Sequence, residues 1–214
     1  MSIITDIKPQ KNKKRVNIYL DGKFAFALPA ETLVKAGLKL GQKLSEKQIE
    51  NLIFKNEFQK LLDKVYRILS LRPRSEKEIE DYLKKKIWKF REDQSKTKDK
   101  MIGEIISVLK EQKLIDDLAF AAWWVEQRAA FRPRGKMALR MELRRKGVDQ
   151  EFIDEAIKKV DELSLAKKAA QKKLKAFKKL DPHEFREKMS AFLARCGFSW
   201  GVVKVVIDDF AKKR

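Results

Sequence analysis

The sequence predicts a mainly α-helical protein: three tandem three-helix repeats in an elongated, curved array, preceded by a small N-terminal β-hairpin or three-stranded subdomain. Two observations predict this fold class. Alternating apolar residues surround an Asp-Gly pair early in the chain, whereas from Ser45 onward apolar residues recur at helical spacing. A basic motif around Pro73 returns 60 positions later around Pro133. The predicted segments are a β subdomain over 1–45 and repeats over 46–115, 116–160 and 161–214.

The N-terminal subdomain is predicted from alternation on both sides of Asp21 and Gly22, the strongest short signal for a β-hairpin. The alternating apolar residues are Val16, Ile18 and Leu20 before the turn and Phe24, Phe26 and Leu28 after it. Isoleucines near the N-terminus predict a third strand, and a short helix is expected before Gly37. A sheet this small is not stable alone, so we expect it to pack on the helical segment that comes next in the chain.

The first repeat opens with a capping box, in which Ser45 and Gln48 exchange hydrogen bonds at the start of a helix. Helical spacing then continues to Leu69, which fits one long helix or two consecutive ones. The stretch from Arg91 to Lys100 is polar and charged, and we interpret it as a loop insertion. The helices of this repeat are expected at about 58–71, 75–88 and 99–113, with Ser75 and Glu78 capping the second.

The second and third repeats show the same order of caps and apolar faces. In the second, Asp116 and Asp149 are the expected N-caps of the outer helices, and the middle helix lies between Gly135 and Gly147. A weaker third copy aligns with the second at an offset of 50, from Gly147 to Gly197. Its helices are expected at about 162–179, 182–196 and 200–212, with Asp181 and Ser199 as caps.

The middle helix of the second repeat divides into two faces. Leu139 and Leu143 are four apart and, flanked by two methionines, form an apolar side that packs inward. A second side is basic, and Glu142 alone offsets the cations along the motif. This basic stripe consists of Lys136, Arg140 and Arg144. Such a helix buries one side and offers the other to a negatively charged partner.

The charge balance of the whole chain points the same way. There are 51 Lys and Arg against 31 Asp and Glu, a net charge of +20, with a pI near 9.9. One explanation is a highly charged helical protein whose surface is basic on average. The size of the excess in a chain of 214 residues favours the other explanation, a nucleic acid or nucleoprotein partner.

The compartment is predicted from what the sequence lacks. Cys196 is the single cysteine, which excludes an intramolecular disulfide and a cysteine-rich zinc site and fits a reducing environment. The first residues do not show the pattern of a signal peptide, and no apolar run approaches the length of a membrane span. We therefore expect a cytoplasmic protein with no membrane contact. A monomer is expected as a separate assumption that these observations do not test.

No catalytic residue, metal site or cofactor is predicted. The single histidine, His183, lies at a helix start without a catalytic partner pattern, and no phosphate-binding loop or metal-binding motif is present in the sequence. Asp116 and Asp117 point apart on a helix, so capping explains them better than a metal pair. Exposed tryptophans can stack on bases, but Trp123 and Trp124 are adjacent and do not share one face, and Trp124 is assigned to the core.

Two basic clusters supply the candidate binding residues. A solvated helix face is the alternative for each, and at Lys84 to Lys86 it carries nearly equal weight, because Glu76 and Glu80 partly neutralise that helix. Arginine predominates in the second cluster, which suits bidentate contacts with phosphate or carboxylate. The candidate residues are Arg72, Arg74, Arg132, Arg134, Lys136, Arg140, Arg144 and Arg145.

Three motifs, in order, resemble those of the RecX regulatory proteins. The first runs from Leu69 to Lys86 and contains Arg-Pro-Arg-Ser, and the second is Leu-Ile-Asp-Asp-x-x-Phe-Ala from Leu114 to Ala121. The third, from Arg132 to Val148, joins Arg-Pro-Arg-Gly to Leu-Arg-Arg-Lys-Gly-Val. The resemblance is strong over about 58–160 and weak beyond, and the N-terminal hairpin is similar to the extension of longer family members.

This resemblance implies a non-enzymatic modulator of the RecA recombinase. Such proteins lie in the helical groove of RecA filaments on single-stranded DNA, block filament extension, and lower ATP hydrolysis, strand exchange and repressor co-cleavage. That implies roles in DNA repair, recombination and the SOS response. From the residues alone, a free-standing nucleic-acid-binding module is a second hypothesis. An enzyme such as a nuclease would need clustered carboxylates, which the sequence does not show.

Overall fold

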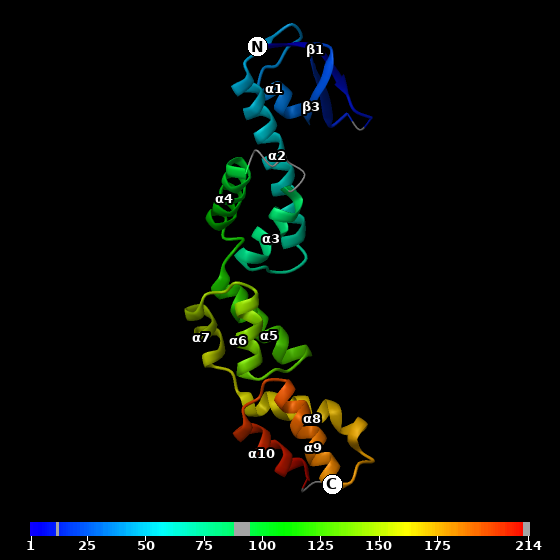
Figure 1. Ribbon diagram of the computed structural model, residues 1–214, viewed down its shortest axis with the longest axis vertical. Helices are drawn as coiled ribbons and strands as arrows, with labels where there is room; N and C mark the ends of the chain where they lie inside the picture. Colours follow the sequence, from blue (N-terminus) through cyan, green and yellow to red (C-terminus); the bar gives the residue numbers. More distant parts are fainter. Residues whose placement is uncertain (12, 88–94, 212–214) are drawn as a thin grey trace. The chain divides into compact units, whose positions relative to one another are not determined.

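The computed structural model describes residues 1–11, 13–87 and 95–211. Within these residues it is mainly helical, with ten helices and one small sheet, as the sequence predicts (Figure 1). After the sheet and one short helix, nine of these described helices follow one another in three sets of three. The chain forms two compact units, which are Met1–Ile68 with Trp88–Ile105, and Leu69–Ile87 with Ile106–Arg214.

Four antiparallel strands form the N-terminal sheet in the order β3-β2-β1-β4. The strands are β1 (Ser2–Pro9), β2 (Arg15–Leu20), β3 (Lys23–Pro29) and β4 (Lys43–Leu44). Asp21 and Gly22 form the predicted two-residue hairpin turn, both with positive φ. The predicted sheet lacked β4, because a strand of two residues is too short to show alternation.

The sheet packs on α1 (Ala30–Lys35) and on the first half of α2 (Glu46–Leu69), as expected. At the start of α2 the predicted capping box is present: the Ser45 N–H donates to Gln48 Oε1 (2.8 Å), and the Gln48 N–H donates to Ser45 Oγ (3.3 Å). The buried core of this unit's sheet consists of Ile4, Val16, Ile18, Leu20, Phe26, Leu28, Leu38 and Leu44.

Phe24 is the exception to the predicted alternation, because it is 57% exposed. The pairing register of β2 and β3 shifts between Ile18 and Tyr19, and such a shift exchanges the faces of the residues beyond it. Phe24 therefore contacts the ring of Tyr19 edge-on, with 6.0 Å between ring centroids, instead of joining the core.

The next helices are α3 (Glu76–Ile87) and α4 (Ser95–Glu111), and α2 is a single continuous helix. The predicted loop insertion over 91–100 is wrong from Ser95 onward, because those residues begin α4. Charged residues are good helix formers, so polarity alone does not mark a loop. Residues 91–94 of that insertion, and residues 88 and 212 at two predicted helix ends, lie outside the described residues.

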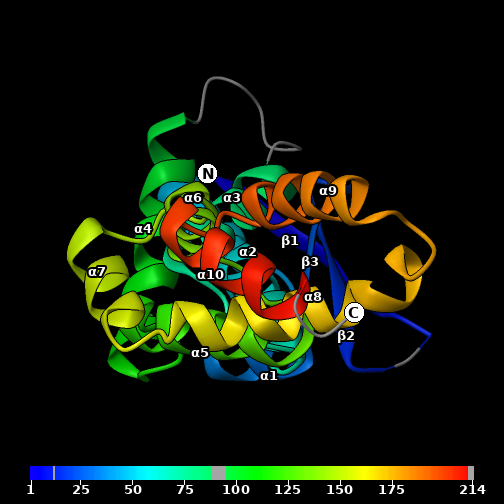
Figure 2. The same cartoon turned by 90° about the horizontal axis from the view of Figure 1, so that it is seen from below.

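The remaining helices follow the predicted order. They are α5 (Asp117–Phe131), α6 (Lys136–Arg145), α7 (Gln150–Lys158), α8 (Glu162–Phe177), α9 (Pro182–Arg195) and α10 (Trp200–Ala211). Asp116 and Asp181 accept backbone N–H groups and cap α5 and α9, as predicted. Asp149 occupies the N-cap position of α7 without a side-chain hydrogen bond. In Figures 1 and 2, α8, α9 and α10 lie side by side.

The cores of the last two sets also follow the predicted apolar faces, with one correction. Leu139 and Leu143 are completely buried, but their flanking residues Met137 and Met141 are 62% and 49% exposed. Residues two apart on a helix lie nearly on opposite sides, so the methionines cannot share the leucine face. The α5–α7 core consists of Phe120, Ala121, Val125, Leu139, Leu143, Val148, Ile153 and Ile157, with Trp123 and Trp124 packed at its edge.

Within the second unit, the N-terminus of α3 meets the C-terminal end of α6. Ser75 is completely buried, and its hydroxyl donates to the Lys146 carbonyl (2.7 Å) while it accepts the Glu78 N–H (3.2 Å). The Glu76 N–H donates to Asp117 Oδ1 (2.8 Å). Burial raises the pKa of Asp117, and this hydrogen bond opposes the rise. Asp117 therefore caps α3, a role that the sequence did not reveal.

The N-terminus of α6 meets the C-terminal end of α9 in the same way. The Gly135 N–H donates to the Cys196 carbonyl (3.0 Å), and the Lys136 N–H donates to Glu162 Oε1 (3.0 Å). A Cβ on Gly135 would lie 2.0 Å from the carbonyl oxygen of Gly197, so no side chain fits there without a shift of the backbone. Ser75 ends the motif Arg-Pro-Arg-Ser, and Gly135 ends the motif Arg-Pro-Arg-Gly. These two small residues are therefore the contact points between successive middle helices.

Replacing Gly135 by Ala should destabilise the protein by roughly 1–3 kcal/mol, because the added methyl overpacks a backbone contact. Urea unfolding measures the change. Gly201→Ala is the matched control: its Cβ would meet nothing within 4 Å in α10, so the variant should be as stable as the wild type, or more stable by about 0.4–1 kcal/mol. Equal stability of Gly135→Ala and the wild type would contradict the contact.

Candidate functional site

In the basic stripe of α6, Arg140 and Arg144 are exposed, but both have partners on α7. Arg140 Nη2 lies 3.3 Å from Asp154 Oδ1, and the Arg144 guanidinium donates twice to Gln150 Oε1 (3.0 and 2.7 Å). A hydrogen bond from Gln150 is the main cause that lowers the pKa of Asp154, and Arg140 adds to it. The expectation that Glu142 alone offsets these cations is therefore incomplete, because α7 supplies a second carboxylate.

Arg72 is part of an internal network. Its guanidinium makes two hydrogen bonds with the carboxylate of Glu78 (2.8 and 3.0 Å), and Lys146 also donates to that carboxylate. Burial opposes the ionisation of Glu78, but the hydrogen bonds and charges of Arg72 and Lys146 outweigh it and lower its pKa. These contacts connect α3 to the C-terminal end of α6, so Arg72 contributes to the joint between repeats.

Glu142 organises a second internal cluster. Its Oε2 accepts hydrogen bonds from Trp124 Nε1 (2.8 Å) and Arg128 Nε (2.7 Å), and its Oε1 lies 3.9 Å from Arg134 Nε. The Arg128 guanidinium and the Lys146 amino group lie 4.5 and 4.8 Å from the Trp124 ring centroid. Trp124 therefore stabilises cations at the edge of the core, and Arg134 is only half exposed.

We call the contact of α3 with α6 the first joint and the contact of α6 with α9 the second joint. The two joints differ in charge. At the first joint Arg72 and Lys146 share Glu78, whereas the residue 60 positions after Glu78 is Ala138, and Cys196 follows Lys146 by 50. Arg132, which corresponds to Arg72, is exposed, and its side chain has no hydrogen-bond or ion-pair partner among the described residues. The second joint thus leaves a guanidinium available.

The other candidate residues fall into two groups. Arg145 is exposed and has no side-chain partner in the part of the chain that the structure describes. Arg74 is half-buried and has an interaction partner, and Lys136 is half-buried with its backbone N–H held by Glu162. Four of the candidate residues are therefore exposed cations, namely Arg132, Arg140, Arg144 and Arg145. Arg72 and Arg134 make internal contacts instead.

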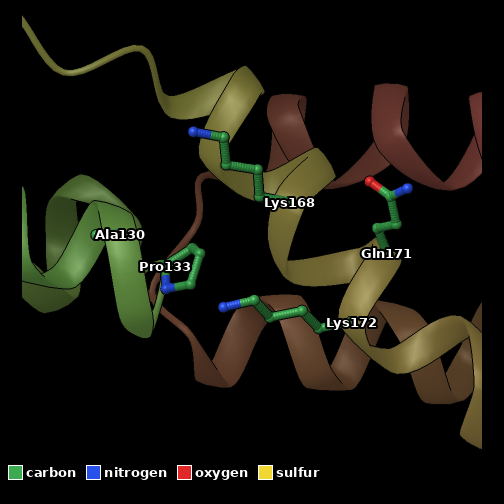
Figure 3. A pocket seen from close by; sticks show the side chains of 5 residues that line it. All are labelled: Ala130, Pro133, Lys168, Gln171 and Lys172. Atoms are coloured by element: carbon green, nitrogen blue, oxygen red, sulfur yellow. The ribbon is translucent and has the colours of Figure 1, made fainter.

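A further basic surface lies on α8, which the sequence reasoning did not single out. Between Leu163 and Leu180 the chain contains lysines and no acidic residue, a signal that is visible in the sequence. A pocket of about 230 Å³ lies between α8 and the end of α5 (Figure 3). It is lined by Ala130, Pro133, Lys168, Gln171 and Lys172.

Neither a membrane span nor a metal site is found among the described residues. None of the helices in residues 1–11, 13–87 and 95–211 is both long and apolar enough to span a bilayer. In the same residues, no three His, Cys, Asp or Glu side chains gather in a way that could hold a metal ion.

Comparison with known proteins gives matches along the chain. Family models of regulatory protein RecX match its N-terminal domain at residues 2–45 and its first, second and third three-helix domains at 62–88, 116–157 and 160–207. Regulatory protein RecX of Bacillus subtilis is 37% identical, covering 98% of this chain and 77% of that protein. The Bacillus licheniformis protein is also 37% identical, covering 98% and 78%. A crystal structure of a regulatory protein RecX has a TM-score of 0.66 at 31% identity and covers 97% of this chain and 100% of its own.

Replacing Glu78 by Gln should lower the free energy of unfolding at pH 7 by about 1–3 kcal/mol, because two cations lose a charged acceptor. The pKa of Glu78 is lowered from 4.5, so its contribution is present above that value and is lost as the pH falls through the lower folded pKa. The difference in free energy of unfolding between wild type and variant should therefore disappear at acid pH. Urea unfolding midpoints measured from neutral to acid pH would show this.

The matched control for this prediction is Glu80→Gln, which removes the same charge from an exposed pair with Lys84. Its effect should stay within about 0.5 kcal/mol at every pH. A stability loss in Glu78→Gln that persists unchanged into acid would contradict the role of the ionised carboxylate.

Proposed function

This chain belongs to the RecX family of regulatory proteins, and from that premise we propose that it binds RecA filaments on single-stranded DNA in their helical groove and inhibits filament extension. It thereby lowers the ATPase, strand-exchange and co-protease activities of the recombinase. Its role belongs to DNA repair, recombination and the SOS response in the cytoplasm. It acts as a monomeric regulator without a catalytic step or cofactor of its own.

The observation that carries this proposal is the accessible cationic face at the start and along the length of α6. Arg140, Arg144 and Arg145 are exposed on one helix, and Arg132 precedes it without an internal partner among the described residues. A filament on DNA presents phosphates and carboxylates, and a guanidinium binds both in bidentate geometry. The joints on both ends of α6 hold this face in position.

A free-standing nucleic-acid-binding module is the second candidate function, favoured by the net charge of +20. Binding of this kind weakens steeply as salt concentration rises, because cations on the protein displace counterions from phosphates. Titration of DNA with the protein, with and without RecA, separates the two candidates. If the protein binds DNA tightly without RecA, and RecA does not increase this affinity, the free-standing nucleic-acid-binding module is favoured.

The charge reversal Arg140→Glu with Arg144→Glu should abolish most of the inhibition of RecA. Glutamates at these positions repel the phosphates and carboxylates of the filament, so we expect the concentration for half-inhibition to rise at least about tenfold. The measurement is DNA-dependent ATP hydrolysis by RecA with substoichiometric amounts of this protein. Circular dichroism should show an unchanged fold, because both side chains are exposed.

The control variant is Lys47→Glu with Lys64→Glu, which makes the same charge change at exposed positions of α2. It should inhibit nearly as well as the wild type. Full inhibition by the Arg140→Glu, Arg144→Glu variant would place the contact surface elsewhere. Absence of inhibition by the wild type at any ratio would refute the proposed function itself.

A further inference from the structure

We propose that the lysine face of α8, together with Phe131, binds one single strand of nucleic acid, with phosphates on the lysines and a base stacked on the phenylalanine ring. The lysine face is defined by Lys168, Lys172 and Lys175. The inference rests on the proposed function, because it names a second surface through which the same regulator reaches the DNA of the filament.

The three lysines lie on one side of α8. They are four and three positions apart, which places their side chains in one row along a helix. Ala166 and Ala170, which are completely buried, lie on the opposite side. The lysine row is therefore the side of α8 turned away from the core of α8, α9 and α10.

Other lysines of α8 have partners within the repeat, whereas Lys168 and Lys175 of this row do not. Lys167 forms an ion pair with Asp209 (2.7 Å), and Lys173 lies over the ring of Phe192. By contrast, Lys168 and Lys175 have no hydrogen-bond or ion-pair partner among the residues that the structure describes. Attraction to the negative end of the helix dipole explains a cation in the last turn only, so it accounts for Lys175 and not for Lys168.

The backbone carbonyl of Phe131 is held beside this row. Lys172 Nζ donates a hydrogen bond to the Phe131 carbonyl (2.9 Å), and an ammonium group keeps further donors for a phosphate. The Phe131 side chain is 70% exposed at the end of α5. In Figure 3, Lys172 extends from α8 toward Pro133 and Lys168 extends to the same side of α8, and both lysines line the pocket of about 230 Å³. Arg132, between Phe131 and Pro133, adds a cation without an internal partner among the described residues.

The combination of groups favours a single strand over other polyanions. An acidic protein surface would need the cations but not an exposed aromatic ring. In a duplex the bases are already stacked and cannot reach such a ring, whereas unpaired bases stack on aromatic side chains while lysines follow the backbone. Ala130, which is exposed in the lining of the pocket, gives a base further apolar surface to cover.

The test is fluorescence anisotropy of a labelled oligothymidylate with the full chain over a range of salt concentrations. For Lys168→Ala with Lys175→Ala, the slope of log affinity against log salt should fall by about 1.4, or 0.7 for each phosphate that is no longer bound. Phe131→Ala should weaken binding about 5- to 150-fold with an unchanged slope, because one stacked base is lost. Phe131→Tyr should restore the affinity, because its ring can stack on the same base.

Lys188→Ala with Lys204→Ala is the matched control, since it removes two exposed lysines of α9 and α10 and should leave the slope unchanged. An unchanged slope in the α8 variant, or equal binding by Phe131→Ala and the wild type, would overturn the inference. RecA inhibition is measured with the same variants. If the α8 variant loses inhibition but keeps its oligonucleotide slope, α8 binds acidic protein and the inference fails while the proposed function stands.

Discussion

The close approach of successive middle helices is the constraint on which the second unit depends. Gly135 lies so near Gly197 that a Cβ would be 2.0 Å from the carbonyl oxygen of Gly197. The Gly135 N–H donates to the carbonyl of Cys196, the C-cap residue of α9, so the opposite ends of two helix dipoles meet. Gly135, the small residue two positions after Pro133, and Gly197, which has positive φ after the last turn of α9, both fit this contact.

The contacts between successive middle helices also determine which cations form ion pairs within the protein. At the first joint, Glu78 lies where it can hold both Arg72 and Lys146, so two cations of the repeated motif stabilise the array. At the second joint the corresponding positions are Ala138 and Cys196, and cohesion comes from backbone contacts and Glu162 instead. Among the described residues, the Arg132 side chain therefore makes no hydrogen bond or ion pair at this joint. Two copies of one motif can thus serve different purposes, and only the packing partners of each copy reveal which.

Local features of this fold were predictable, because their causes lie within a few residues. The Asp21-Gly22 turn, the capping box at Ser45 and the cap at Asp181 all depend on groups close in sequence. Two features that the sequence reasoning missed have long-range causes. Asp117 caps a helix that begins 41 positions earlier, and nothing near it in the sequence indicates this. The lysines of α8 were visible, but their importance depends on Phe131, also 41 positions away from Lys172.

The accessible positive charge of the second unit comes mainly from cations that are not paired at the contacts between middle helices. Glu78, Glu142 and Glu162 are each placed at a helix junction or core edge, where they neutralise cations or accept backbone N–H groups. Because these glutamates are used in such contacts, several exposed cations, namely Arg132, Arg145, Lys168 and Lys175, have no acidic side-chain partner among the described residues. Arg144 meets the neutral Gln150, whereas Arg140 pairs with Asp154 of α7. The contacts that hold the repeats together therefore also determine which cations stay accessible to a negatively charged partner.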